Sequence, residues 1–326
     1  MTLVNQLYTK YSIYRKAAEK ERISGKMEAY SHLFEPKESI DSHLFFQAIE
    51  EMGVSPSDNI LIRLNSRFSS HYEGGLVKFY KDLFTYVDSQ NGNILSLSYT
   101  FDRSPLMYLS QDNIFHENMP TNTGLANEIF RRMPNVHRSF HPTHSVSAYG
   151  KNSQEIVSSH HLDPYAYSKK SPLYYISGKY NGKEIIVGLN HYTINLHFIE
   201  DKSESFGFID NLVASRININ GNTSRIPFLV DNPFKKMTCH YHTSLCMDEL
   251  FKSGVLQQKI VSGISIYVYN AKKHADLLIS LREQNICKFK DLKLKTFLLN
   301  KIVKPIVLKN YFNLKNGILY PKKVDS

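Results

Sequence analysis

The sequence predicts an α/β fold in which a mixed sheet is flanked by helices. Short apolar runs alternate with stretches of helical periodicity, an order typical of α/β sheets. The chain of 326 residues is 42% hydrophobic, which is enough for one large or two modest domains. No repeat of solenoid length and no low-complexity linker divides it. We therefore expect one compact unit that could split into two lobes around a ligand.

The expected elements begin with a helix that Asp41 and Ser42 cap and Gly53 ends. Ile60-Leu61-Ile62 forms the first strand, and Gly74-Gly75 precedes the next helix. Further strands are expected at 93–98, 183–189 and 264–269, and further helices at 76–86, 127–133, 242–252 and 271–281.

The two ends of the chain differ from its middle in composition. Residues 1–43 include a charged stretch from Tyr11 to Leu33 that predicts a basic helical extension, and residues 44–283 form the predicted central domain. Residues 284–326 form a basic C-terminal extension in which lysines mix with apolar residues. We favour a helix and a strand docked on the core with lysines outside. A peripheral contact with acidic lipid is the alternative that stays open.

Composition limits where the protein works and what it binds. No apolar run reaches membrane-spanning length, the N-terminus lacks the succession of a signal peptide, and three cysteines cannot form a paired framework. These features predict a cytoplasmic protein. The net charge of +10 favours anionic partners, although a basic surface also serves solubility alone. A nucleic-acid partner is not expected, because no recognition motif accompanies the charge.

The segment Thr193–Glu200 carries the first candidate for catalysis. His197 follows the strand that is predicted to end near Leu189, and ligands bind at strand ends in α/β sheets. A histidine beside a carboxylate has the pKa that a general base needs near neutral pH. Glu200 lies three residues on, and Asp231 is a distant second acid that could orient the ring. A structural histidine that caps a helix is the competing interpretation.

A turn rich in histidine and serine is the second candidate. His141 and His144 flank Pro142-Thr143, and the proline fixes the turn, so that both side chains can be held in place. They line a site, or the turn only hydrogen-bonds its own backbone. The sequence supports both interpretations equally.

Motifs for nucleotides and metals are weak or missing. Gly74-Gly75 before a helix suits a phosphate, because bare amides and a helix N-terminus attract anions. The chain has no Walker motif, no Gly-x-Gly-x-x-Gly fingerprint and no serine nucleophile elbow. Cys239, His242 and Cys246 would fall near one helix face, but the spacing is not that of a common zinc site. We favour partly buried cysteines and expect no metal.

The block from Phe115 to Gly150 carries the most specific motif of the chain. It includes Pro120, Gly124, Glu128, Phe130-Arg131-Arg132, Pro134, Arg138-Ser139, His141-Pro142, His144-Ser145 and Ala148-Tyr149-Gly150. Weaker blocks follow one another around it: Met52–Ile62, Ser66 with Gly74-Gly75, Gly92–Leu95, Ser171–Leu173, Val187-Gly188 and Leu196–Glu200. Together they resemble the aminoglycoside 3-N-acetyltransferase family, from about residue 44 to residue 283.

The resemblance implies acyl transfer from acetyl coenzyme A to an amino group, without a covalent enzyme intermediate. It makes His197 the base that takes the proton of the attacking amine, helped by Asp231, with Glu200 as the runner-up. An ammonium must lose a proton before it attacks a thioester, so this role agrees with the chemistry. The resemblance also implies a cofactor channel that is lined by Ser66, Gly74, Gly75, Arg138, Ser139, His141 and Ser145.

Two positions depart from the family pattern. The family usually has His-Ser-Ser-Leu after its first strand, where this chain has Leu64-Asn65-Ser66-Arg67. It commonly has threonine three residues before the catalytic histidine, where this chain has Ile194, with Thr193 one position earlier. The first departure changes part of the expected cofactor loop.

The net charge bears on the acceptor. Aminoglycosides are polycations, whereas this chain is basic. We therefore expect a small amino sugar that is anionic or weakly charged, linked to a nucleotide or a lipid for surface polysaccharide synthesis. An aminoglycoside resistance enzyme and a non-catalytic binding protein on the same fold are the alternatives. The sequence leaves the oligomeric state open.

Overall fold

The computed structural model describes residues 39–88, 90–101, 105–109, 113–179, 182–189, 209–231 and 249–284. The chain divides into two compact units, Glu38–Lys290 and the pair of segments Met1–Lys37 and Asp291–Ser326. All described residues belong to the first unit. The two predicted extensions therefore lie almost entirely outside the described residues.

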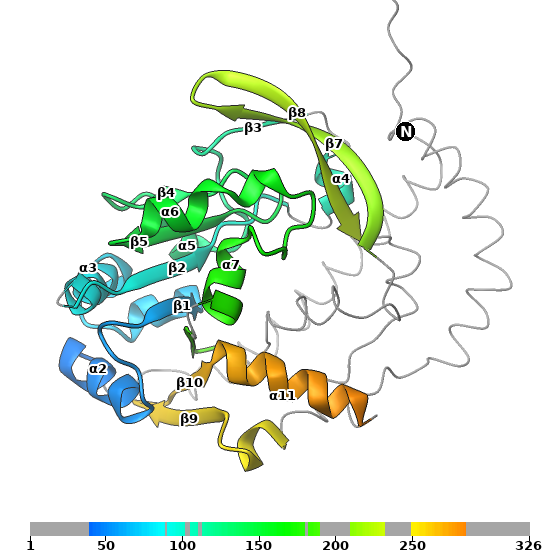
Figure 1. Ribbon diagram of the computed structural model, residues 1–326. Helices are drawn as coiled ribbons and strands as arrows, with labels where there is room; N and C mark the ends of the chain where they lie inside the picture. Colours follow the sequence, from blue (N-terminus) through cyan, green and yellow to red (C-terminus); the bar gives the residue numbers. More distant parts are fainter. Residues whose placement is uncertain are drawn as a thin grey trace, which may run out of the picture. The chain divides into compact units, whose positions relative to one another are not determined.

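Helices and strands alternate through most of this unit (Figure 1). The helices are α2 (Ser42–Glu51), η2 (Ser66–Ser70), α3 (Gly75–Asp88), α4 (Pro105–Leu109), α5 (Leu125–Arg131), α6 (Ser153–Ser158), η3 (His160–Leu162), α7 (Pro172–Tyr174), η4 (Tyr175–Lys179) and α11 (Ala271–Glu283). The strands are β1 (Asn59–Leu64), β2 (Asn93–Leu97), β3 (Ile114–Phe115), β4 (His137–Arg138), β5 (Val146–Gly150), β6 (Lys183–Val187), β7 (Ile209–Ile219), β8 (Asn222–Asp231), β9 (Leu256–Val261) and β10 (Ile264–Asn270).

One sheet has seven strands in the order β4-β5-β2-β1-β6-β10-β9. β1 is parallel to both of its neighbours, β2 and β6, and the outer pairs are antiparallel. The predicted mixed α/β fold is therefore confirmed. From β1, the chain goes to β2 on one side and later to β6 on the other. The carboxyl end of β1 is thus a topological switch point, where α/β sheets bind ligands.

Apolar residues cover both faces of this sheet. Helices α2, α3 and α5 pack on one face through residues such as Phe45, Phe79 and Phe130, and these contact alternate residues of β1 and β6. Segments α6, α7, η4 and α11 cover the other face, where Leu61 and Leu95 lie. The alternation within β1 follows from the two-residue period of a strand.

A second sheet has three strands in the order β3-β7-β8. β7 and β8 form a long hairpin whose two-residue turn is Asn220-Gly221, both with positive φ (51° and 87°). Asparagine and glycine tolerate this backbone, so Asn-Gly is a common hairpin turn. We did not predict this hairpin from the sequence.

Most of the elements predicted for the first half of the chain are confirmed. Asp41 caps α2, since its Oδ1 accepts a hydrogen bond from the amide of Leu44 at 2.7 Å. α5 begins two residues before its predicted start at Asn127. None of the described helices combines the length and the apolarity that crossing a bilayer requires.

Candidate functional site

The loops after β1 and β6 are tied together at the switch point. Asn65 follows β1, and its Nδ2 donates a hydrogen bond to the carbonyl oxygen of Gly188 at 3.3 Å. The amide of Asn65 also donates to the carbonyl of Val187 at 3.0 Å. From here the chain continues into residues 190–208, which contain His197 and Glu200 and lie outside the described residues.

The structure places the backbone of Asp231 at the last position of β8. Asp231 pairs there with Ile209, the first residue of β7. Because residues 190–208 lead directly into Ile209, the segment that carries His197 ends beside Asp231. The pairing of this acid with His197 stays a prediction.

Ser66 lies in the loop after β1, at the start of α5. Its Oγ accepts a hydrogen bond from the amide of Ala126 at 3.4 Å, and the side chain is half-buried. Gly124, directly before α5, has φ +109°, and a Cβ there would lie 3.6 Å from Ser66 Oγ. The Asn65 side chain caps η2 by accepting from the amide of Arg67 at 3.0 Å. The loop after β1 is therefore packed against the N-terminus of α5.

Gly74 and Gly75 have left-handed backbone conformations, with φ +79° and +71°. Glycine adopts these without a steric penalty, which explains the pair at the start of the 14-residue helix α3. The helix follows β1, so its N-terminus lies at the carboxyl edge of the parallel strands. The side chain of Lys78 folds back over Gly74, because a Cβ at Gly74 would lie 2.6 Å from Lys78 Cδ. A helix N-terminus with a lysine beside it suits an anion.

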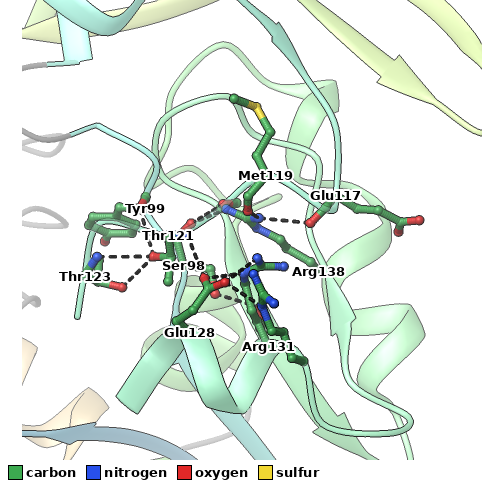
Figure 2. A network of polar contacts seen from close by, with 12 residues as sticks. Ser98, Tyr99, Glu117, Met119, Thr121, Thr123, Glu128, Arg131 and Arg138 are labelled. Atoms are coloured by element: carbon green, nitrogen blue, oxygen red, sulfur yellow. Dashed lines mark hydrogen bonds and ion pairs between the residues drawn. The ribbon is translucent and has the colours of Figure 1, made fainter. Parts of the chain in front are cut away.

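Arg138 is a buried clamp between backbone segments (Figure 2). Its Nη2 donates to the carbonyl of Ser98 at 2.6 Å and its Nε donates to Ser145 Oγ at 3.0 Å. Its Nη1 donates to the carbonyls of Glu117, at 2.9 Å, and Met119. A guanidinium has five N–H donors in a rigid fork, and here they hold three chain segments in fixed positions.

The surroundings of Arg138 are also charged and aromatic. The guanidinium lies over the ring of Phe115, 5.3 Å from its centroid. Burial and the neighbouring Arg131 lower the pKa of Arg138 to about 10, so the group stays charged at neutral pH.

Glu128 organises the loop before α5. It accepts from both Arg131 and Arg132 and from the amide of Thr121 at 2.9 Å (Figure 2). Despite the opposing effect of burial, these donors lower the pKa of Glu128 to about 2. Thr123 continues the network by donating to the carbonyl of Leu97, at the end of β2.

Ser139 and His160 form a buried pair. His160 Nε2 lies 2.9 Å from the carbonyl oxygen of Ala166, so this nitrogen carries the hydrogen. His160 Nδ1 is then an acceptor, and the Ser139 hydroxyl donates to it at 2.9 Å. Burial lowers the pKa of His160 to about 4, and the ring is neutral at pH 7. Ser139 Oγ also accepts from the amide of Val146 at 2.9 Å.

His141 is also fully buried and neutral. Its Nδ1 accepts from the amides of Thr143 at 3.3 Å and His144 at 3.0 Å, so Nε2 carries the hydrogen. Burial, with His160 and His144 nearby, lowers the pKa of His141 well below its usual value. Among the described residues, Nε2 has no hydrogen-bond acceptor. The ring packs on Phe228 of β8, with centroids 4.8 Å apart.

The predicted cofactor residues thus fall into two groups at one edge of the sheet. The side chains of Arg138, Ser139, His141 and Ser145 are buried and bonded to other parts of the chain. Ser66, Gly74 and Gly75 are partly or fully exposed. Side chains of the first group can position the turn, whereas the second group can meet a ligand directly. Their role in binding the cofactor stays a prediction.

Aromatic side chains beside the turn were missed by the sequence reasoning. Tyr99 and Phe101 follow β2, and their rings lie 4.8 and 4.9 Å from that of His144. Tyr167 lies 5.3 Å from His144 on another side. The Tyr-Thr-Phe run directly after an expected strand was the available signal. These rings add a polarisable, half-buried surface to the carboxyl edge.

A buried ion pair within the sheet was missed as well. Arg63 Nη1 of β1 contacts Glu184 Oε1 of β6 at 2.8 Å, and Tyr269 donates to the other oxygen of this carboxylate. Burial raises the pKa of Glu184, although Arg63 and Tyr269 oppose this effect. Single charged residues inside two apolar strands were the signal in the sequence. The pair fixes β6 against β1 next to the switch point.

No cluster of metal ligands occurs in the part of the chain that the structure describes. The weak zinc candidate, Cys239 with His242 and Cys246, lies outside that part.

A comparison with protein families matches residues 90–280 to the aminoglycoside 3-N-acetyltransferases. The chain belongs to this family. Its members are N-acetyltransferases that use acetyl coenzyme A, and the predicted family is confirmed. A search of curated protein sequences gave no match.

Solved structures of this acetyltransferase family share the fold at low identity. AAC-VIa bound to sisomicin is 18% identical, with 76% of this chain and 98% of that chain covered and a TM-score of 0.60. AAC-IIIb in a binary complex with CoASH is 16% identical, with 76% and 97% covered and a TM-score of 0.60. YokD from Bacillus subtilis is 16% identical, with 73% and 91% covered and a TM-score of 0.55.

Proposed function

We propose that this chain transfers the acetyl group of acetyl coenzyme A to the amino group of an amino sugar that is linked to a nucleotide or a lipid. The observation that carries the proposal is the path of the segment with His197 and Glu200. This segment leaves β6 at the switch point and ends at Ile209, opposite Asp231. A base on such a segment can reach a ligand at the carboxyl edge. The CoASH complex of AAC-IIIb supports the choice of co-substrate.

His197 is the proposed base. The ring accepts the proton of the acceptor amine, and the amine nitrogen attacks the thioester carbonyl of acetyl coenzyme A, which supplies the activated acyl group. The new C–N bond forms as the C–S bond breaks, and the imidazolium returns its proton to the leaving thiolate. Asp231 orients the ring and stabilises its charged form, with Glu200 as the second choice.

The exposed loop residues fit the anionic part of the co-substrate. Gly74 and Gly75 provide positive-φ backbone at the start of α3, and Lys78 lies over Gly74. Such a helix start favours a pyrophosphate. Ser66 lies in the preceding loop, beside the N-terminus of α5. The buried turn Arg138–Ser145 acts as the wall that holds these loops in register.

Resistance to aminoglycosides is the second candidate function. Relatives with the same fold have been solved with sisomicin and apramycin, which favours such acceptors. The net charge of +10 argues against a polycationic acceptor, because like charges repel. The changed Leu64-Asn65 loop is what favours a third candidate, a non-catalytic binding protein.

The test is release of free thiol from acetyl coenzyme A with nucleotide-linked amino sugars, free amino sugars and aminoglycosides. We expect turnover with the linked sugars and a loss of at least about 100-fold in His197→Ala, the usual worth of a general base. Turnover with aminoglycosides, together with resistance on expression, would favour the second candidate. Neither turnover nor coenzyme A binding would overturn the proposal and favour the non-catalytic protein.

A further inference from the structure

Two arginines lie directly opposite each other on the β7–β8 hairpin. The antiparallel register pairs Arg216 with Arg225, so both side chains belong to the same face of the ribbon. The next pair on that face, Asn218 and Thr223, is joined by a side-chain hydrogen bond of 3.2 Å. Like charges directly opposite on neighbouring strands destabilise a sheet. A hairpin that keeps such a pair gains stability when an anion bridges the two guanidinium groups.

The composition of the hairpin supports an anionic ligand. From residue 211 to residue 230 the sequence contains these two arginines and no aspartate or glutamate. The acids Asp210 and Asp231 lie at the base of the hairpin. The planar, bidentate donor fork of arginine matches the geometry of phosphate.

Contacts at the other end of the hairpin fix it beside the candidate site. The ring of Phe228 packs on His141, and the amide of Leu229 donates to the carbonyl of Pro164 at 2.7 Å. Arg225 lies three residues before Phe228, which is roughly 10 Å along a strand. The arginine pair is therefore held at a short, defined distance from the turn that walls the candidate site.

The neighbouring strand gives a second link to the site. β3 pairs with β7 next to the arginine pair, with Ile114 opposite Arg216 and Phe115 opposite Ile217. Phe115 in turn carries the guanidinium of Arg138 over its ring. The hairpin and the buried clamp thus share β3 as a common support.

We propose that Arg216 and Arg225 bind the phosphate group that links the amino sugar to its nucleotide or lipid. The proposal rests on the proposed function and assigns the part of the acceptor that the hairpin recognises. The sugar amine lies at the edge that His197 serves, and the phosphate lies outward along β8. The hairpin selects phosphate-linked sugars over free sugars and over polycations.

Binding to the full chain tests the proposal without any turnover. Inorganic pyrophosphate is titrated calorimetrically into the protein with saturating coenzyme A present, so that the phosphate site of the co-substrate is filled. We expect Arg225→Gln and Arg216→Gln each to weaken pyrophosphate binding about tenfold, the loss of one charge-assisted contact. Arg225→Lys keeps the charge without the fork and should lose less. Lys272→Gln, an equal change of charge on α11, is the control and should leave binding unchanged.

The source of the phosphate is tested in two further arms. One titrates uridine diphosphate, and the other measures binding to phosphatidylcholine vesicles that contain a polyisoprenyl diphosphate. The arm that weakens in Arg225→Gln identifies the link as nucleotide or lipid. Unchanged binding of pyrophosphate and of both of these ligands in the arginine variants would overturn the proposal.

Kinetics separate this inference from the proposed function. In Arg225→Gln the KM for a phosphate-linked acceptor should rise about tenfold, while kcat and the KM for acetyl coenzyme A stay the same. A rise in the KM for acetyl coenzyme A instead would assign the pair to the co-substrate and overturn the inference. Absence of thiol release with every acceptor would refute the proposed function, whereas the pyrophosphate result would still stand.

Discussion

The turn Arg138–Ser145 and the loop Ser66–Gly75 lie at the same edge of the sheet and differ in how their polar groups are used. The turn directs its side chains inward, where Arg138 binds backbone carbonyls and Ser139 binds His160. The loop leaves Gly74 exposed and Gly75 and Ser66 half-buried. A buried network costs stability when one member is removed, whereas exposed groups change affinity with little effect on stability. One region builds the site, and the other is open to a ligand.

Removal of the buried clamp should give the largest effect on stability. Arg138→Gln would leave up to three buried carbonyl groups without a donor, at roughly 1–3 kcal/mol each. We expect the free energy of unfolding in urea to fall by at least about 3 kcal/mol. Arg132→Gln is the matched control, because the Arg132 side chain is 65% exposed. It should cost less than about 1 kcal/mol, the usual limit for a surface ion pair. Equal losses in the two variants would contradict the distinction between the regions.

Acid should weaken the buried turn next. The pKa of His160 is about 4 in the folded protein, lowered by burial, against an ordinary value of 6.5. Between these values the unfolded chain binds a proton that the folded chain does not, so stability falls as the pH drops from 6.5 to 4. The full difference corresponds to about 3 kcal/mol. Urea unfolding of the native chain and of His160→Gln across this window measures it. The pH dependence should become shallower in the variant, and an identical slope would exclude His160 as its origin.

The exposed loop should show the smallest effect on stability and a distinct effect on binding. Gly75→Ala places a side chain at φ +71°, which costs roughly 1–2 kcal/mol. Gly254→Ala is the matched control, because it has φ +70° and an added Cβ meets nothing within 4 Å. Both variants should lose similar stability in urea unfolding. Only Gly75→Ala should weaken coenzyme A binding in calorimetry, by several-fold. Equal affinity in the two variants would remove Gly75 from the predicted cofactor channel.

Local signals were sufficient for much of the central sheet. Asp41 predicts the start of α2 through its capping side chain, and Ile60-Leu61-Ile62 predicts β1 through its apolar run. The hairpin was missed, although Asn220-Gly221 lies between alternating apolar and polar residues and is a strong signal for such a turn. The strands β4 and β5 have no comparable signal, because two and five residues form them through partners in β2.

The site was predictable in place but not in depth. The resemblance gathered Ser66, Gly75 and the turn residues, and the structure has them at one carboxyl edge. The role of Arg138 as a clamp depends on carbonyls 40, 21 and 19 residues away in the sequence. Burial of this kind arises from tertiary packing, and a single sequence carries no record of it. The same is true of His160, whose partner Ser139 lies 21 residues earlier.

Asn65 stands where the family usually has histidine, and its amide group links two moving parts of an enzyme. The oxygen caps η2 through Arg67, and the nitrogen holds Gly188, which leads into the segment of His197. A short amide with one arm on each loop works like a rigid coupling rod. A shift of the loop after β1 is passed on to the backbone that carries the proposed base. Occupancy of one substrate pocket can thereby set the readiness of the other.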